Sequence, residues 1–126
     1  MKKTLIVGTV AFDEIETPQE NSGKILGGAA TYIGLSSALF NSKASIISVV
    51  GGDFDQKYLD LLKSKGLNTD SIEIISKGKT FYWKGKYHKD WNKRDTLNTQ
   101  LNVLADFNPV VTEQDSSSEI IVLGNL

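Results

Sequence analysis

Short hydrophobic runs alternate with segments of helical spacing along most of the chain. The runs are rich in β-branched side chains, and most are closed by glycine, as at Gly8. They occupy residues 4–7, 45–50, 72–75 and 119–123. Such runs are typical of strands buried on both faces of a parallel sheet. A strand, helix, strand, helix order with short glycine-marked connections predicts an α/β protein with right-handed crossovers.

Two segments between these runs have apolar residues at helical spacing. The first covers residues 29–40, with Asn41 near its end. The second begins after Asp53 or Asp55, either of which can cap its first turn, and ends before Gly66. Its expected apolar face consists of Tyr58, Leu59, Leu61 and Leu62. These segments predict helices that cover the sheet.

Two other segments alternate with a period of two. Residues 12–26 are interrupted by Pro18 and a polar turn, and predict two short strands that project from the main body. Residues 80–104 predict a long antiparallel hairpin. Its first strand has Phe81, Trp83 and Tyr87 on one side, and its second has Leu97, Leu101 and Val103. We expect both pairs to form one small sheet over a cleft; an α+β extension without a ligand beneath it is the alternative.

Composition narrows the function classes. The chain has 126 residues, a net charge of −1 and no cysteine, which excludes disulfides and thiolate metal sites. The basic and aromatic residues of 84–94 do not form a patch that would predict a nucleic-acid partner. No apolar run approaches the roughly 20 residues that span a bilayer. The first 12 residues superficially imitate a signal peptide, but Asp13 and Glu14 follow at once. A buried first strand and a cytoplasmic location are the better interpretation.

Asp13 and the pair Gly27-Gly28 are the strongest candidates for a ligand site. Asp13 follows the first strand, and ligands of open α/β sheets bind at the carboxyl ends of strands. The glycines permit positive φ and close approach of a ligand, and the unpaired N–H groups of the following helical turn would point at it. Taken singly, each also has an ordinary explanation, as a solvated loop carboxylate or a flexible loop before a helix.

Several other motifs fail on spacing. Gly78-Lys79-Thr80 is not the end of a P-loop, because Glu73 stands where that loop requires glycine. No GxGxxG follows the first strand, which argues against a dinucleotide fold. His88 is the only histidine, so it forms no metal pair and is interpreted as a surface or lid residue. No Ser-His-Asp set can be assembled.

Four motifs in this order resemble the ribokinase (PfkB) family of carbohydrate and nucleoside kinases. They are GTVAFD at 8–13, GGAATYIG at 27–34, VVGGDF at 49–54 and GKT at 78–80. The resemblance runs over residues 4–126 and implies an αβα sandwich with a β-clasp lid. Residues 1–126 would be the N-terminal portion of one ribokinase-like domain. The lid strands would lie near 12–26 and 79–104, with Phe81 and Trp83 among the lid residues.

The resemblance implies transfer of the γ-phosphoryl group of ATP, with Mg²⁺, to a sugar hydroxymethyl group. It assigns Asp13, Gly27 and Gly28 to the sugar hydroxyls. The family's catalytic aspartate and its GxGD anion hole belong to the C-terminal half and are expected beyond Leu126. Because phosphoryl transfer depends on positioning and charge stabilisation, we expect this chain alone to be inactive.

Two positions depart from the family pattern. Ala11 and Tyr32 stand where many members carry asparagine. Tyr32 either stacks on a sugar or base ring or faces the core, and Asn125 is either a pocket residue or a turn residue. The expected ligand is a sugar or nucleoside, and exposed lid edges make a homodimer through the lid plausible. The alternatives are a nucleoside kinase of the same fold and a binding module for a polyol or nucleoside without chemistry.

Overall fold

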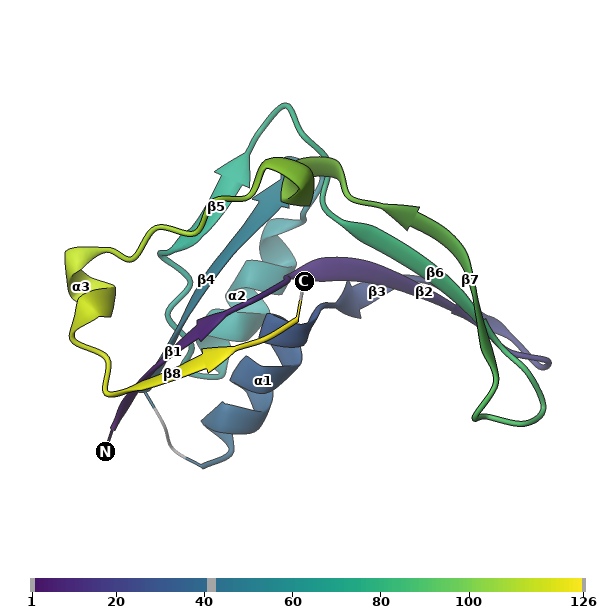
Figure 1. Ribbon diagram of the computed structural model, residues 1–126, viewed down its shortest axis with the longest axis horizontal. Coiled ribbons are helices and arrows are strands. Elements are labelled where there is room, and N and C mark those ends of the chain that lie inside the picture. Colours follow the sequence, from purple (N-terminus) through teal and green to yellow (C-terminus); the bar gives the residue numbers. More distant parts are fainter. Residues whose placement is uncertain (1, 41–42, 126) are drawn as a thin grey trace.

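A parallel sheet forms the body of the computed structural model, which describes residues 2–40 and 43–125 (Figure 1). Its four strands are β1 (Lys3–Val7), β4 (Lys43–Gly51), β5 (Ile72–Ile75) and β8 (Ile120–Leu123), in the order β5-β4-β1-β8. In the register of this sheet, Ile6 lies between Ile46 and Val122. All three strand pairs are parallel, so the predicted α/β architecture is confirmed.

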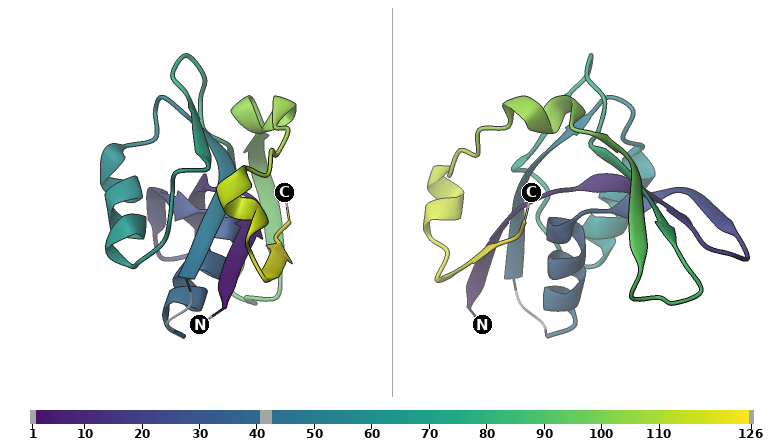
Figure 2. Two further views of the ribbon diagram at one scale, coloured as in Figure 1. Left: turned by 90° about the vertical axis from the view of Figure 1, so that its left-hand side faces the viewer. Right: turned by 45° about the vertical axis from the view of Figure 1, so that its right-hand side comes forward.

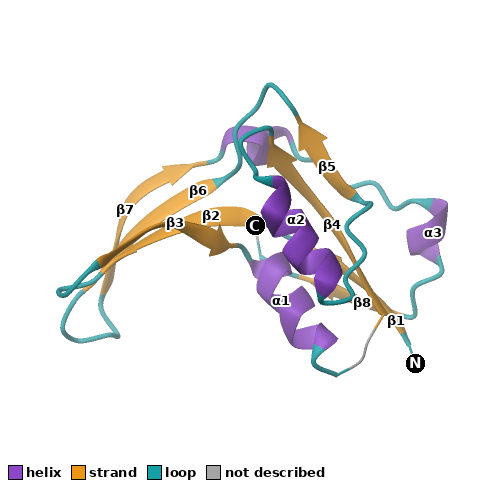
Figure 3. Cartoon of the chain, turned by 180° about the vertical axis from the view of Figure 1, so that it is seen from behind, coloured by secondary structure: helices purple, strands orange, loops and turns teal. Residues whose placement is uncertain are grey.

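Helices α1 (Ala29–Ala38) and α2 (Gln56–Ser64) cover the same face of this sheet (Figure 3). Asp55 caps α2 by accepting a hydrogen bond of 2.9 Å from the N–H of Lys57, as predicted. The side chains of Leu59 and Leu62 are buried against the sheet. Leu61 is 42% exposed, so its predicted place on the apolar face is wrong. It lies two residues from Leu59 and therefore points away from the stripe.

Helix α1 ends at Ala38, two residues before the predicted end at Phe40. The prediction for Asn41 lies outside the described residues. Gly66 has a φ of 87°, as expected for the residue that follows a helix C-cap. No helix in the described part of the chain is long and apolar enough to cross a membrane.

A second sheet projects from the body and forms the lid (Figures 1 and 2). Its strands are β2 (Ala11–Glu16), β3 (Asn21–Gly27), β6 (Tyr82–Tyr87) and β7 (Arg94–Gln100), in the order β3-β2-β6-β7. The two hairpins pair through β2 and β6, which run parallel. This sheet is therefore built from two separate segments of the chain, residues 11–27 and 82–100.

Strand β7, the second strand of the hairpin predicted over residues 80–104, is shorter than predicted. It ends at Gln100, and a 3₁₀ turn, η1 (Asn102–Asp106), begins where Asn102 takes a positive φ of 49°. Val103 is buried, and its N–H donates to the carbonyl of Lys79 at 3.0 Å. Placing Val103 on the lid strand was therefore wrong, because its side chain is buried at the base of the lid.

The base of the lid is tied to the body by an aromatic cluster and a hydrogen-bonded pair. The rings of Phe12, Phe54 and Tyr58 lie 5.4–5.9 Å apart between centroids, joining β2 to α2 and the loop before it. The hydroxyl of Thr80 donates to Asp53 Oδ1 at 2.7 Å and accepts from the Gly51 N–H at 3.0 Å. These contacts fix where the lid leaves the body.

Strand β8 lies at the edge of the parallel sheet and is not buried as predicted. Ile121 is 62% exposed and Leu123 is 77% exposed, and within the described residues no helix covers them.

The short helix α3 (Glu113–Ser116), which precedes β8, is held by Asp115. The buried carboxylate of Asp115 accepts hydrogen bonds from the hydroxyls of Ser71 and Thr112.

Candidate functional site

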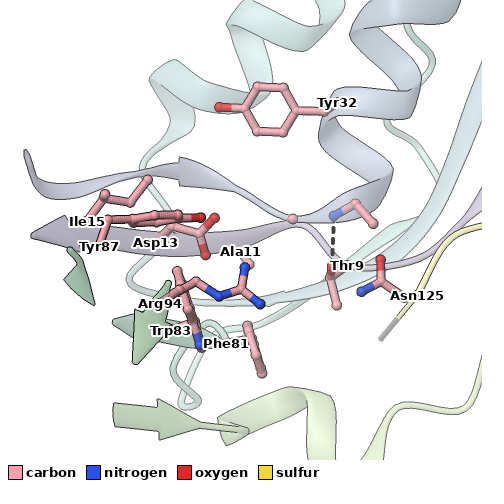
Figure 4. A pocket seen from close by; sticks show the side chains of 12 residues that line it. Thr9, Ala11, Asp13, Ile15, Tyr32, Phe81, Trp83, Tyr87, Arg94 and Asn125 are labelled. Atoms are coloured by element: carbon pink, nitrogen blue, oxygen red, sulfur yellow. Dashed lines mark hydrogen bonds between the residues drawn. The ribbon is translucent and has the colours of Figure 1, made fainter. Parts of the chain in front are cut away.

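A pocket of about 500 Å³ lies between the N-terminus of α1 and the lid sheet (Figure 4). Its walls come from the β1–β2 connection, strand β2, the start of α1, the lid hairpin and the end of β8. The lining residues are Thr9, Ala11, Asp13, Ile15, Gly28, Ala29, Tyr32, Phe81, Trp83, Tyr87, Arg94 and Asn125. The sequence candidates Asp13, Gly28, Tyr32, Phe81, Trp83 and Asn125 therefore surround one cavity.

Asp13 presents a carboxylate without a protein partner to this pocket. It lies on β2 between Ile25 of β3 and Trp83 of β6. Within the described residues, its side chain forms no hydrogen bond or ion pair. Burial raises the pKa of the Asp13 carboxyl above its ordinary value. A half-buried carboxylate with free lone pairs is suited to accept hydrogen bonds from ligand hydroxyls.

The two glycines have different tasks. Gly28 has a φ of 98°, and a Cβ there would overlap the carbonyl of Thr9, so only glycine fits. Gly28 also lines the pocket. Gly27 lies behind Asp13 and outside the lining, and a Cβ at Gly27 would overlap the Asp13 carboxylate. The structure thus places Gly27 where it makes room for the acid; contact of either glycine with a sugar stays a prediction.

Thr9 accepts hydrogen bonds from the first two N–H groups of α1. Its Oγ1 accepts from the N–H of Ala29 at 3.0 Å, and its carbonyl accepts from the N–H of Ala30 at 2.9 Å (Figure 4). The expectation that the N–H groups of this turn are unpaired is wrong for these two. The sequence reasoning missed Thr9, although a hydroxyl residue directly after the glycine that closes β1 was a usable signal.

Tyr32 and Asn125 both line the pocket. Tyr32 is 54% exposed, and its hydroxyl donates to the carbonyl of Leu26 at 2.8 Å. The alternative of a core-facing Tyr32 is therefore wrong. Asn125 follows β8 and lies on the opposite side of the pocket from Trp83 and Tyr87 (Figure 4). The ligand contacts of both residues stay predictions.

The lid contributes an aromatic wall. Phe81, Trp83 and Tyr87, which were predicted to share one side of the hairpin, all line the pocket. The Trp83 Nε1–H donates to Thr96 Oγ1 at 3.3 Å. Arg94 lies with its guanidinium carbon 5.3 Å from the centre of the Trp83 ring. Arg94 was not among the predicted site residues, because its place in the pocket depends on the hairpin register, which pairs Arg94 with Tyr87.

On the lid's second face, Glu14 and Lys84 are paired residues of β2 and β6, and their charged atoms lie 2.7 Å apart. The hydrogen bond from Lys84 lowers the pKa of Glu14. His88, predicted to be a surface or lid residue, forms a close contact of 2.7 Å between its Nε2 and Oδ2 of Asp95 across the hairpin. In the part of the chain that the structure describes, no three His, Asp or Glu side chains gather as metal ligands.

Sequence relatives of this chain are kinases. No family model matches it. A cytidine kinase of Thermococcus kodakarensis is 30% identical over 90 residues, which cover 71% of this chain and 32% of the relative. A nucleoside kinase of Methanothermobacter thermautotrophicus is 30% identical over 115 residues, with 68% of this chain and 37% of the relative covered. The chain thus spans about a third of the length of these curated relatives.

Solved structures share the fold. A nucleoside kinase of Methanocaldococcus jannaschii, described as an archaeal member of the ribokinase family, matches 98% of this chain with a TM-score of 0.77 and 23% identity. A ribokinase of Cryptococcus neoformans in complex with ADP matches 98% with a TM-score of 0.78 and 18% identity. The chain covers 44% and 42% of these two structures. A Burkholderia thailandensis nucleoside kinase in complex with inosine matches 80% of this chain and 36% of its own length, with a TM-score of 0.71 and 22% identity. The predicted ribokinase-like fold is confirmed over the part that this chain covers.

Proposed function

The chain belongs to the ribokinase (PfkB) family, and from this premise we propose that it supplies the substrate side of an ATP-dependent kinase. The reaction would transfer the γ-phosphoryl group to a sugar hydroxymethyl group. The observation that carries the proposal is the Asp13 carboxylate, which has no hydrogen-bond or ion-pair partner among the described residues and faces a cavity between Gly28 and the lid aromatics.

Asp13 is proposed to hold the sugar by accepting hydrogen bonds from two of its hydroxyls. Each charge-assisted bond is worth roughly 1.5–3 kcal/mol. Gly28 has no side chain that would cover the backbone beside the carboxylate. The missing side chain of Gly27 lets the Asp13 carboxylate pack directly against β3. The lid would exclude water from the substrate, which protects the transferred group from hydrolysis.

The nucleotide and its metal ion are proposed to bind to the remainder of the protein. ATP supplies the phosphoryl group and Mg²⁺ would neutralise its developing charge. The residues of this chain would orient the acceptor hydroxyl and close the site. We therefore propose that residues 1–126 alone have no kinase activity. Sugar-dependent ADP release by this fragment would contradict the proposal, and its absence in the fragment with activity in the full-length protein would support it.

A nucleoside kinase is the second candidate. Four aromatic side chains line the pocket, namely Tyr32, Phe81, Trp83 and Tyr87, and flat rings of this kind stack on nucleobases. The curated relatives named above are a cytidine kinase and a nucleoside kinase. A module that only binds a polyol or nucleoside is the candidate from another class, and it would bind ligand without ATP turnover.

A substrate panel on the full-length protein separates these candidates. Free pentoses and hexoses, nucleosides and polyols would each be tested for ADP release, with Asp13→Ala as the control. Turnover of a sugar or nucleoside that falls sharply in Asp13→Ala supports the proposed kinase. Equal turnover in Asp13→Ala would remove the role given to the acid, and ligand binding without turnover would favour the binding module.

Location and assembly stay proposals from the sequence. A cytoplasmic location agrees with the absence of cysteine. The outer lid strands β3 and β7 are edges of the described sheet, and all seven residues of β7 are exposed. Pairing of such edges is the route by which two lids would form a homodimer. Light scattering of the full-length protein, with and without substrate, would decide the oligomeric state.

A further inference from the structure

Among the described residues that line the pocket, Arg94 is the single cation. Its side chain reaches from the lid toward the cavity beside Trp83 (Figure 4). Within residues 2–40 and 43–125, the guanidinium forms no ion pair and no side-chain hydrogen bond. Its N–H donors are therefore available to a ligand.

Trp83 forms a firm platform for this guanidinium. The indole lies over Gly85, where a Cβ would overlap its six-membered ring, and the ring N–H donates to Thr96. The indole is thus held by the strand beneath it and by the neighbouring strand. A guanidinium stacked on an aromatic ring is restrained at its face, while its planar N–H groups point outward.

The pocket has an anionic and a cationic position. Asp13 accepts hydrogen bonds and Arg94 only donates them. Asp13 and Trp83 are paired residues of β2 and β6, and Arg94 is paired with Tyr87 further along the hairpin. A ligand that satisfies both positions carries hydroxyl donors at one end and acceptors at the other, with a flat group between the aromatic rings.

We propose that Arg94 determines substrate specificity by binding two adjacent acceptors on the base of a nucleoside. The inference rests on the proposed function, in its nucleoside form, with the ribose hydroxyls on Asp13. A guanidinium fork matches paired acceptors, as it does O6 and N7 of guanine. Hypoxanthine offers the same O6 and N7 pair, and cytosine offers O2 and N3. Adenine places an amino group beside N7, and each uracil carbonyl is next to N–H or the glycosidic nitrogen.

A carboxylate or phosphate on a sugar also offers adjacent acceptor atoms. The aromatic lining favours the base, because Tyr32, Phe81 and Tyr87 also line the pocket and an anionic sugar has no flat ring to stack on such side chains. Lysine separates the two sources. It keeps the charge that attracts an anion, but it loses the planar fork that reads a pair of neutral acceptors.

The test measures kcat/KM of the full-length protein for cytidine, inosine, guanosine, uridine, adenosine and an anionic sugar. The variants are Arg94→Gln and Arg94→Lys, with Lys93→Gln as the matched control. Lys93 directly precedes Arg94 in the lid hairpin, carries the same charge and does not line the pocket. We expect the native protein to prefer cytidine, inosine and guanosine. The cytidine-to-uridine ratio should fall about ten- to a hundredfold in both Arg94 variants and stay native in Lys93→Gln.

Equal use of cytidine and uridine by the native protein would overturn the proposal, as would a native ratio in Arg94→Gln. Turnover of the anionic sugar that survives in Arg94→Lys but not in Arg94→Gln would also overturn it, while leaving the proposed kinase intact. Failure to phosphorylate any sugar or nucleoside would overturn the proposed function and this inference together.

Discussion

The Asp13 carboxylate lies directly against the Cα of Gly27, in space that a Cβ at residue 27 would occupy. The two residues sit on the paired strands β2 and β3, and of the two only Asp13 lines the pocket. The motif requires glycine at both residue 27 and residue 28, but for different reasons. Gly28 needs its positive φ, whereas Gly27 needs the missing side chain.

Gly27→Ala should displace the carboxylate and weaken substrate binding. We expect a loss of about 1.5–3 kcal/mol, since one charge-assisted hydrogen bond would be misplaced. Isothermal titration of the full-length protein with its sugar or nucleoside measures this loss. In a double-mutant cycle with Asp13→Ala, Gly27→Ala should cost little more. A full additional loss in the Asp13→Ala background would show that Gly27 acts by another route.

Asp13→Asn should stabilise the protein at neutral pH while it abolishes tight substrate binding. The folded-state pKa of Asp13 is raised by burial, so its ionisation opposes folding. This penalty is absent below the unfolded pKa and appears as pH rises through the folded pKa. The stability advantage of Asp13→Asn should therefore grow from about pH 3 to pH 7, as measured by thermal unfolding.

Glu14→Gln provides the comparison of opposite sign. Lys84 lowers the pKa of Glu14, so its contribution to stability is present above the unfolded pKa and is lost as pH falls through the folded pKa. Glu14→Gln should therefore destabilise the protein near pH 7 and become neutral in acid. The same trend with pH in both variants would contradict the opposite pKa shifts of these neighbours.

Thr9→Val should destabilise the start of α1. The substitution keeps the side-chain shape and removes the Oγ1 that accepts from the Ala29 N–H. Loss of a helix cap of this kind costs about 0.5–2 kcal/mol, which urea unfolding can measure. Thr9→Ser retains the oxygen and should recover most of the loss. Equal stability of Thr9→Val and native protein would mean that water or the lid replaces the cap.

Thr80→Val should loosen the base of the lid. The buried Thr80 hydroxyl links Asp53 to the Gly51 N–H, and valine would leave both without this partner. We expect a loss of about 1–3 kcal/mol in the free energy of unfolding. Hydrogen exchange in β6 and β7 should accelerate, while Thr80→Ser should exchange at the native rate. Native exchange in Thr80→Val would show that the aromatic cluster alone holds the lid.

The repeating patterns along the chain were sufficient to predict the parallel sheet and the paired lid. Period-two alternation identified both lid hairpins, and glycine positions marked the ends of buried runs. Asp13 was proposed as a site residue because ligands of open α/β sheets bind at the carboxyl ends of strands, and Gly28 because glycine before a helix permits positive φ and close approach of a ligand. These features depend on local pattern and on general rules of topology, so one sequence contains enough information to find them.

Other features depend on contacts between distant segments. Thr9 caps α1 only because the β1–β2 connection passes beside residues 28–30, and Arg94 enters the pocket only because the hairpin register shifts between Lys84 and Gly85. The exposure of Leu123 could not be read from its hydrophobic run, because such a run is compatible with an edge as well as with a buried strand. Register and cover are properties of the assembled fold.

Strand β2 carries Asp13 and is hydrogen-bonded along its length to β6, where Trp83 is the facing partner. Movement of the lid away from the body would therefore not leave Asp13 behind in the site. If the projecting sheet swings as a unit, the acid and the indole travel together, while Tyr32 and Asn125 remain with the body. Product release would then break the contacts with one of these two groups of residues in a single motion.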